Sequence, residues 1–222
     1  SRYGNASQWA EGLRSARFFA GIADARAQMS RGQLDQAQAQ AEQIVRSGFP
    51  EKAPALELLA DIYEKQGRFA DAADLYRQAG AGGAQDEKRL AGRAARGRAL
   101  AAAQRGDYDA AEREFQSGLL LDRDDPWIRY EFARFMIDRN RPADAESLLR
   151  SLSASQNPDS LYAAALIRND LGQPGAAELL LDQVPQAQRT AAMRNLSLKL
   201  KTDSGIARAK ARGQTGRAAE GL

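Results

Sequence analysis

One short pattern recurs five times in the 222 residues, and it limits the possible fold more than any other feature of the sequence. Each copy has an Ala, then Gly or Asn seven residues later, then an apolar residue or Pro two positions further on, and finally a second Ala. The Gly or Asn positions are 32, 67, 106, 140 and 172, so the successive steps are 35, 39, 34 and 32 residues. A nearly constant period of this kind indicates stacked copies of one structural unit.

The residue types in the pattern predict a pair of helices joined by a tight turn. Gly or Asn can adopt the left-handed conformation that ends a first helix, and Ala lets two helices approach closely. Ala, Arg and Leu dominate the composition, while Val and Ile are scarce, so we expect an all-α protein. Since one helix pair cannot bury its apolar face alone, the pairs must stack into a solenoid. The structural positions are Gly32, Ala37, Ala60, Gly67, Ala72, Gly106, Ala111, Ala133, Ala145, Ala165, Gly172 and Ala177.

The second copy resembles the tetratricopeptide repeat consensus at every signature spacing. Its matching residues are Ala60, Tyr63, Gly67, Phe69, Ala72, Tyr76 and Ala79. The resemblance implies a right-handed superhelical solenoid over 1–222 in which the first helix of each pair lines the concave surface. The expected repeats are 18–50, 53–86, 92–125, 126–157 and 158–186.

Several segments depart from this period. The Gly-rich stretch 80–86 lengthens one step and is either a longer loop or a hinge, and a helix should follow it from about Glu87 to Arg105. Residues 187–203 predict an unpaired amphipathic helix that interrupts the array, because apolar residues recur there every three or four positions. Residues 204–222 read as the start of a further repeat, and 8–16 as a separate helix, either a cap or half of a truncated repeat.

A second resemblance rests on the C-terminal half. The segments DPWIRYEFAR at 125–134, SLYAAAL at 160–166, LDQVP at 181–185 and RTAAM at 189–193 are similar to the repeats of the bacterial cellulose synthase operon protein C family. That family has tandem tetratricopeptide repeats followed by an outer-membrane β-barrel that exports cellulose. The resemblance implies a periplasmic scaffold that links the inner-membrane synthase to the outer-membrane pore. It also implies contacts with other proteins of the complex, and with the glucan chain or peptidoglycan, and membrane attachment only through a downstream barrel absent from this sequence.

The residue inventory argues against catalysis. The sequence has no Cys and no His, which removes thiol nucleophiles, imidazole bases and the usual zinc ligands. Glu57 and Asp61 share one helix face and form a charged stripe, whereas Asp122, Asp124 and Asp125 are expected to serve as turn residues and as negative charge before a helix. We therefore expect no enzyme activity, no cofactor and no metal. The net charge of +3 is too small to predict a nucleic-acid partner, and no run approaches the roughly 18 apolar residues of a membrane span.

Binding is expected on the first helices. Carried over by position from the repeat family, the candidate residues are Trp127, Tyr130, Arg134, Tyr162, Asn169, Arg93, Arg96, Glu57 and Asp61. A wider set adds Phe19, Ile22, Arg26, Met29, Glu64 and Leu166. Trp127, Tyr130 and Arg134 share one helix face, where they would stack on a sugar, anchor a peptide, or pack against the preceding repeat.

These observations leave two functional hypotheses. The first is a non-catalytic scaffold of cellulose biosynthesis and export. The second is a generic peptide-binding tetratricopeptide adaptor, or a repeat protein of another exopolysaccharide-secretion system. The same fold serves many functions, so the repeats alone do not separate them.

Overall fold

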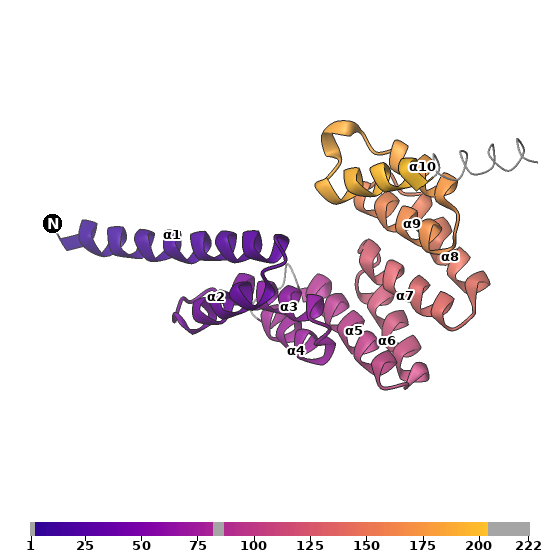
Figure 1. Cartoon of the computed structure of the whole chain (residues 1–222). Coiled ribbons are helices and arrows are strands. Elements are labelled where there is room, and N and C mark those ends of the chain that lie inside the picture. The colour runs from indigo at the N-terminus through magenta and orange to yellow at the C-terminus, as the bar shows by residue number, and fades with distance from the viewer. Residues whose placement is uncertain (1–2, 82–86, 204–222) are drawn as a thin grey trace, which may run out of the picture. The chain divides into compact units, whose positions relative to one another are not determined.

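The computed structural model describes residues 3–81 and 87–203, with side chains from residue 7 onward, and nearly all of these residues are helical (Figure 1). The helices are α1 (Tyr3–Ser30), α2 (Leu34–Arg46), α3 (Ala53–Lys65), α4 (Phe69–Gly80), α5 (Glu87–Gln104), α6 (Tyr108–Leu121), α7 (Pro126–Asp138), α8 (Pro142–Ser153), α9 (Pro158–Asp170), α10 (Pro174–Asp182) and the short 3₁₀ helix η1 (Gln186–Gln188). Residues 191–203 are also helical. Over these two ranges there is no strand, and no helix is long and apolar enough to cross a bilayer. The predicted all-α fold is confirmed.

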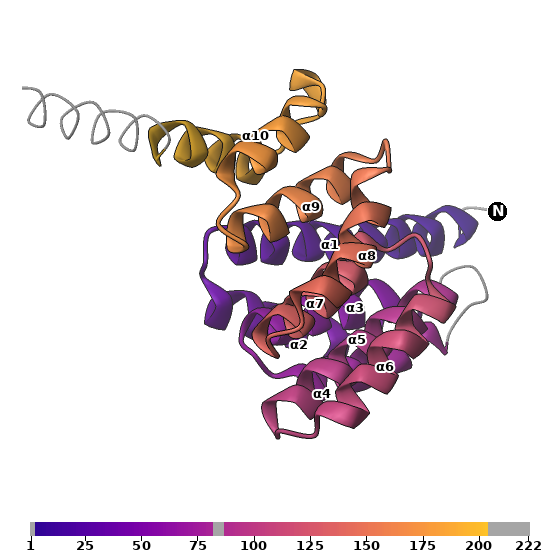
Figure 2. The same ribbon diagram turned by 90° about the vertical axis from the view of Figure 1, so that its right-hand side faces the viewer.

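The chain divides into two compact units, Ser1–Ile128 and Arg129–Leu222, and the division falls within α7. In the first unit, helices α1 to α6 form three antiparallel pairs, and α3 also packs against α2 while α5 packs against α4. Figure 2 shows α5 and α6 running side by side. In the second unit, α9 packs against both α8 and α10. The expectation of one continuous array, with the repeat limits given above, stays a prediction.

All five predicted turn residues have a positive φ. The values are +77° at Gly32, +75° at Gly67, +79° at Gly106, +57° at Asn140 and +71° at Gly172. Each turn closes its first helix with the same two backbone hydrogen bonds, for which the second turn serves as the example. There the amide of Gly67 donates to the carbonyl of Glu64 at 2.9 Å, and that of Arg68 to the carbonyl of Tyr63 at 2.9 Å. This Schellman arrangement satisfies carbonyls that the helix end would leave unpaired, and the second helix then begins two residues after the turn.

Replacing Gly67 with Ala should therefore destabilise the fold by about 1–2 kcal/mol, because a Cβ disfavours the left-handed conformation. Urea unfolding followed by circular dichroism measures the change. The matched control is Gly175→Ala within α10, where φ is not positive and an added Cβ meets nothing within 4 Å. That variant should gain roughly 0.5–1 kcal/mol, since it loses less entropy on folding. If the free energy of unfolding changed in the same direction in both variants, the role assigned to the turn would be contradicted.

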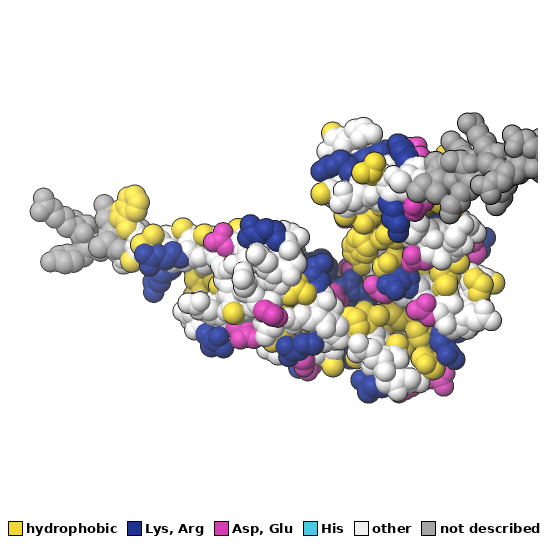
Figure 3. Space-filling model, in the orientation of Figure 1, with side chains coloured by type: hydrophobic (Ala, Val, Ile, Leu, Met, Phe, Trp, Pro, Cys, Tyr) yellow, Lys and Arg dark blue, Asp and Glu magenta, His cyan; other side chains and the backbone are white. Residues whose placement is uncertain are grey.

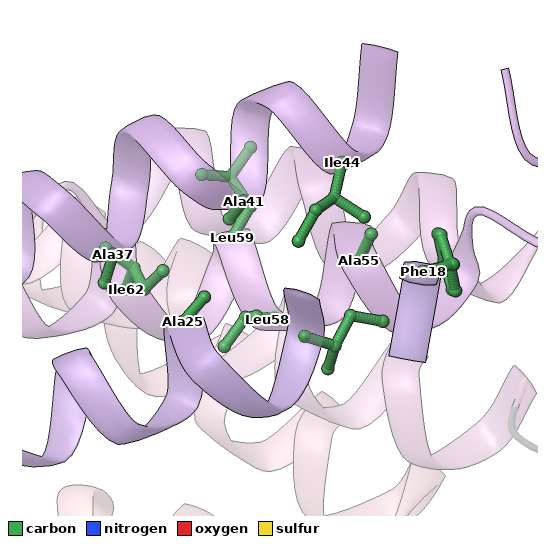
Figure 4. Packing of buried hydrophobic residues seen from close by; sticks show 10 residues of the cluster. Phe18, Ala25, Ala37, Ala41, Ile44, Ala55, Leu58, Leu59 and Ile62 are labelled. Carbon is green, nitrogen blue, oxygen red and sulfur yellow. The ribbon is translucent and has the colours of Figure 1, made fainter. Parts of the chain in front are cut away.

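Ala residues occupy the positions where paired helices come closest. The Ala seven residues before each turn and the Ala five residues after it are fully buried in all five copies. Figure 4 shows this packing in the first unit, where Ala25, Ala37 and Ala41 lie among larger side chains such as Leu58 and Ile62. The small residues fix the helix spacing, and the large ones fill the space between successive pairs.

The N-terminal segment differs from its prediction. Residues 8–16 do not form a separate helix, because α1 runs without a break from Tyr3 to Ser30 and contains the first helix of repeat one. In Figure 1, the N-terminal part of α1 extends past the end of α2.

The other irregular segments are only partly described. Helix α5 spans Glu87–Gln104, in agreement with the predicted helix. The region predicted as an unpaired helix, 187–203, contains the end of η1 and then the helical residues 191–203, whose apolar face is buried through Met193, Leu196 and Leu200. Most of the Gly-rich stretch and all of 204–222 lie outside the described residues.

Candidate interaction surface

Two rows of opposite charge face each other on the first helices of repeats two and three. The acidic row consists of Glu57, Asp61 and Glu64 on α3, and the basic row of Arg89, Arg93 and Arg96 on α5. We call these six residues the charge ladder. Within each row the side chains are spaced four and three residues apart, so each row runs along one helix face, and each Arg follows its acidic counterpart by 32 residues.

The ladder is held by short, partly bidentate ion pairs. Arg89 places Nη1 2.6 Å from Glu57 Oε1 and Nη2 2.9 Å from Oε2. Arg93 Nη1 lies 2.8 Å from Glu57 Oε1 and 3.3 Å from Asp61 Oδ1. Bidentate Arg–carboxylate pairs are among the stronger and more directional contacts in proteins, so the ladder joins α3 firmly to α5.

Arg96 is the most buried member of the ladder, with a side chain only 9% exposed. Its Nη2 lies 2.6 Å from Glu64 Oε2, and its Nη1 lies 4.0 Å from Asp125 Oδ2. Burial lowers the pKa of this guanidinium, but Glu64 and Asp125 outweigh that effect and hold the pKa above its usual value. Arg96 is therefore a permanently charged group enclosed by two carboxylates.

Tyr76 of α4 lies beside the acidic row. Its hydroxyl donates to Asp61 Oδ1 at 2.6 Å, and its ring is fully buried. Burial, and then the charges of Glu64 and Asp61, raise the pKa of the Tyr76 phenol well above its usual value. The phenol therefore stays protonated and remains a hydrogen-bond donor.

The structure brings together four of the nine predicted binding residues in this ladder: Glu57, Asp61, Arg93 and Arg96. Glu57 and Asp61 pair with Arg93, and Arg96 pairs with Glu64 of the wider set, so these predicted binding residues form an internal interface between repeats two and three. Arg89, Tyr76 and Asp125 were not singled out as partners. The equal 32-residue separation of the two rows is the signal that could have identified Arg89.

The predicted aromatic residues of the C-terminal half are more accessible. In the second unit, Tyr130 and Tyr162 are half-buried, and this burial raises the pKa of both phenols. Arg134 is exposed; its guanidinium carbon lies 5.6 Å from the centroid of the Tyr130 ring, and its Nε lies 3.9 Å from Asp170 Oδ2 at the end of α9. Asn169 is half-buried on α9. The geometry thus leaves a cation–aromatic surface on α7 and α9 with the polar side chains that a ligand needs.

Trp127 belongs to the first unit and is half-buried. Its backbone amide donates to Asp125 Oδ1 at 2.7 Å, so Asp125 caps the start of α7, as expected for that Asp-rich turn. Asp122 in turn accepts a hydrogen bond from the amide of Asp124 at 3.2 Å.

The first repeat corrects one member of the wider set of candidates. Ile22 does not face a ligand surface; it is only 4% exposed and belongs to the core between α1, α2 and α3. Phe19 and Arg26 are exposed, Met29 is half-buried, and so is Leu166 in the second unit.

A groove of about 760 Å³ beside the N-terminal part of α1 was not predicted. Its floor is aromatic, because the rings of Phe18 and Phe49 stack with centroids 4.1 Å apart and Phe19 meets Phe49 edge-on at 6.3 Å. Charged residues such as Glu11 and Arg14 line the part formed by α1. Phe49 lies in the connection after α2, where the sequence pattern carries no signal for a groove.

Two family models, both described as tetratricopeptide repeat, match residues 22–87 and 102–169, together more than half of the chain. A solved structure of a thermophilic tetratricopeptide protein of Thermus thermophilus superimposes with a TM-score of 0.57. It is 15% identical in sequence, and the match covers 83% of this chain and 99% of the other, so it supports the fold alone. The chain is a tetratricopeptide repeat protein.

More specific relatives are two cellulose synthase operon proteins C. The protein of Xanthomonas axonopodis pv. citri (strain 306) is 28% identical over 229 residues, covering 85% of this chain and 15% of the relative. That of Pseudomonas fluorescens (strain SBW25) is 37% identical over 119 residues, covering 51% of this chain and 9% of the relative. The chain is thus similar to part of these two proteins, and it spans less than a fifth of the length of either relative.

Proposed function

We propose that this chain is a non-catalytic periplasmic scaffold of a bacterial cellulose biosynthesis and export system. The observation that carries the proposal is its similarity to cellulose synthase operon protein C over 85% of its length, on a fold made of tetratricopeptide repeats. In this role the repeats hold proteins of the inner-membrane synthase and of the outer-membrane pore at a fixed separation. The surface also guides the emerging glucan or contacts peptidoglycan.

The proposed contact surface consists of Tyr130 and Arg134 on α7 and Tyr162 and Asn169 on α9. The charge ladder is a poorer contact surface, because its side chains are at most 34% exposed and its charges are held in short ion pairs between α3 and α5, whereas Arg134 is 45% exposed and its ion pairs with Glu131 and Asp170 are longer, at 3.8 and 3.9 Å. On α7 and α9, two half-buried aromatic rings and an exposed guanidinium offer stacking and hydrogen bonding together. Such a surface suits either a peptide segment of a partner protein or a sugar chain.

The first test is genetic and uses the whole protein in a cellulose-producing bacterium. A strain lacking the protein is complemented either with the unchanged protein or with one that carries Arg134→Ala and Tyr162→Ala. Cellulase-sensitive polymer outside the cell should fall several-fold with the double variant at equal protein level. The matched control, Arg150→Ala, changes an exposed Arg of α8 and should leave the polymer unchanged. Equal export by both variants would contradict the proposed surface, and unchanged export after in-frame deletion of the region would contradict the function.

A second test addresses the compartment. The sequence has no Cys, so a single Leu179→Cys introduces one thiol at a position that is 69% exposed. In cells with a permeabilised outer membrane and an intact inner membrane, a membrane-impermeant maleimide should label this thiol. Labelling only after cell lysis would place the chain in the cytoplasm and would favour the adaptor hypothesis.

A further inference from the structure

Helix α1 carries a second apolar face that no other part of the described chain covers. The stripe consists of Trp9, Leu13, Ala16, Ala20, Ala23 and Ala27, spaced alternately four and three residues apart, and all six are exposed. Trp9 is 78% exposed and Leu13 is 53% exposed. The opposite face, with Phe18, Ile22 and Ala25, is buried in the core of the first unit. Figure 3 shows hydrophobic side chains on the side of α1 that faces away from α2.

The equivalent face of the other first helices in this unit is a helix-packing surface. Counted from the turn, Ala20, Ala23 and Ala27 correspond to Ala55, Leu58 and Ile62 on α3, and to Ala94, Gly97 and Ala101 on α5. All six equivalents are buried. On α5 the approach is so close that a Cβ added at Gly97 would lie 3.0 Å from the Cβ of Ala73 on α4. Because the equivalent faces of α3 and α5 pack against a neighbouring helix, we expect the stripe on α1 to pack against a helix as well.

The sizes of the side chains along the stripe identify the helix that fits. Large residues lie at the N-terminal end and Ala residues at the other end. If two copies of α1 run antiparallel about a twofold axis level with residue 18, Trp9 of each copy lies opposite Ala27 of the other. In the same alignment Leu13 lies opposite Ala23, and Ala16 opposite Ala20. Every large side chain therefore meets a small one, as close helix packing requires.

We propose that α1 pairs antiparallel with α1 of a second copy of this chain through the stripe. The rest of the first unit packs on the opposite side of α1, so it leaves the approach open. The 19 residues from Trp9 to Ala27 span about 27 Å of helix. An interface made by one helix pair lies near the lower limit of roughly 1,000 Å² for specific association, so the dimer should be reversible.

The residues that flank the stripe near the twofold axis predict how salt affects pairing. Phe19, which is 48% exposed, lies on one side and adds apolar contact with its own counterpart. Arg17 and Asp24 lie exposed on the other side, so repulsion between the two copies of Arg17 is offset by attraction between Arg17 of one copy and Asp24 of the other. Because these charges offset each other and the stripe is apolar, added salt should change the dimer little, whereas a dimer held by ion pairs would weaken.

Sedimentation equilibrium of the 222-residue chain should show a monomer–dimer equilibrium that changes little with added sodium chloride. Ala23→Trp places a bulky side chain opposite Leu13 and should yield a monomer. The matched control, Ala39→Trp, alters an exposed Ala of α2 and should still dimerise. Circular dichroism establishes that both variants fold. A chain that is monomeric at every concentration, or an Ala23→Trp variant that dimerises as well as the control, would overturn the proposal.

Disulfide trapping tests the antiparallel register, since the natural chain has no Cys. The double variant with Leu13→Cys and Ala23→Cys should form a covalent dimer under mild oxidation, because position 13 of each copy lies opposite position 23 of the other. Ala23→Cys alone should not, since its two copies are about 15 Å apart along the antiparallel pair, beyond the reach of a disulfide. Efficient cross-linking of Ala23→Cys to itself would show a parallel pair and overturn the register. This inference goes beyond the proposed function, and its tests do not depend on cellulose export.

Discussion

Replacing Arg96 with Met should destabilise the first unit by about 3–5 kcal/mol, the cost typical of removing one partner from a buried ion pair. Met keeps much of the side-chain volume, so the loss reports the charge. The side chain of Arg96 is 9% exposed, and its removal leaves Glu64 and Asp125 enclosed without their cation. The free energy of unfolding is measured with urea, following the helical circular dichroism signal.

Arg98→Met is the matched control, two residues along the same helix. Arg98 pairs with Glu114 at 2.8 Å, but the two side chains are 45% and 31% exposed. An exposed pair contributes about 1 kcal/mol or less, because water screens it and two long side chains lose freedom. If the two Met variants lose equal stability, the charge ladder does not hold α3 to α5 in the way proposed.

A double variant separates the stability contributed by the Glu64–Arg96 ion pair from the cost of leaving Glu64 buried without a partner charge. Glu64→Gln removes the acidic partner, so Arg96→Met should cost less in that background than in the natural chain. Since buried pairs are screened less than exposed ones, the cost of Arg96→Met should also persist at high salt. Purely additive losses would mean that Glu64 and Arg96 do not act as a pair.

The turns were predictable from the sequence because their requirement is local. A residue at positive φ must be Gly, or less often Asn, whatever surrounds it, so Gly67 and Asn140 could be located without knowledge of the fold. The buried Ala positions followed from the same frame. A left-handed backbone conformation and a close approach of two helices each restrict the residue type at a single position, so both can be recognised in the sequence.

The partners within the charge ladder depend instead on how two helices lie alongside each other. Asp61 is six residues before its turn, whereas Arg93, which it meets, is 13 residues before the next turn. Residues at the same repeat position on α3 and α5 therefore do not lie opposite each other. The two turns are 39 residues apart, whereas the paired side chains are 32 residues apart, so the repeat frame does not reveal which side chains meet. The sequence could place acidic and basic residues on first helices, but could not show that they would bind one another.

The unbroken α1 was missed for a related reason. The repeat frame begins near residue 18, so the preceding residues were assigned to a separate element. No Pro or capping signal interrupts residues 8–30, and Gly12 and Gly21 are tolerated within the helix. The repeat period identifies only the residues of the repeating unit, so it does not predict that a helix extends beyond that unit.

Phe115→Ala should produce a second large loss of stability, about 3–5 kcal/mol, because it empties space at the centre of the third pair. Phe115 lies nine residues after its turn and is fully buried. The same repeat position holds Ala41, Tyr76, Leu149 and Leu181, all fully buried as well. In four of the five copies a large residue at this position fills the gap left by the small residues where the helices cross, whereas the first copy has Ala41.

The expected effect reaches beyond the third pair. In stacked repeats the stability of each pair depends on its neighbours, so weakening α5 and α6 should also broaden or split the urea transition. Leu120→Ala is the matched control, because Leu120 lies on the same helix as Phe115 and is 73% exposed, so its loss should cost about 1 kcal/mol or less. Helical signal and Trp fluorescence, followed in the same titration, reveal whether the transition has one step or two. A single sharp transition for Phe115→Ala, as stable as that of Leu120→Ala, would show that this position does not sustain the stack.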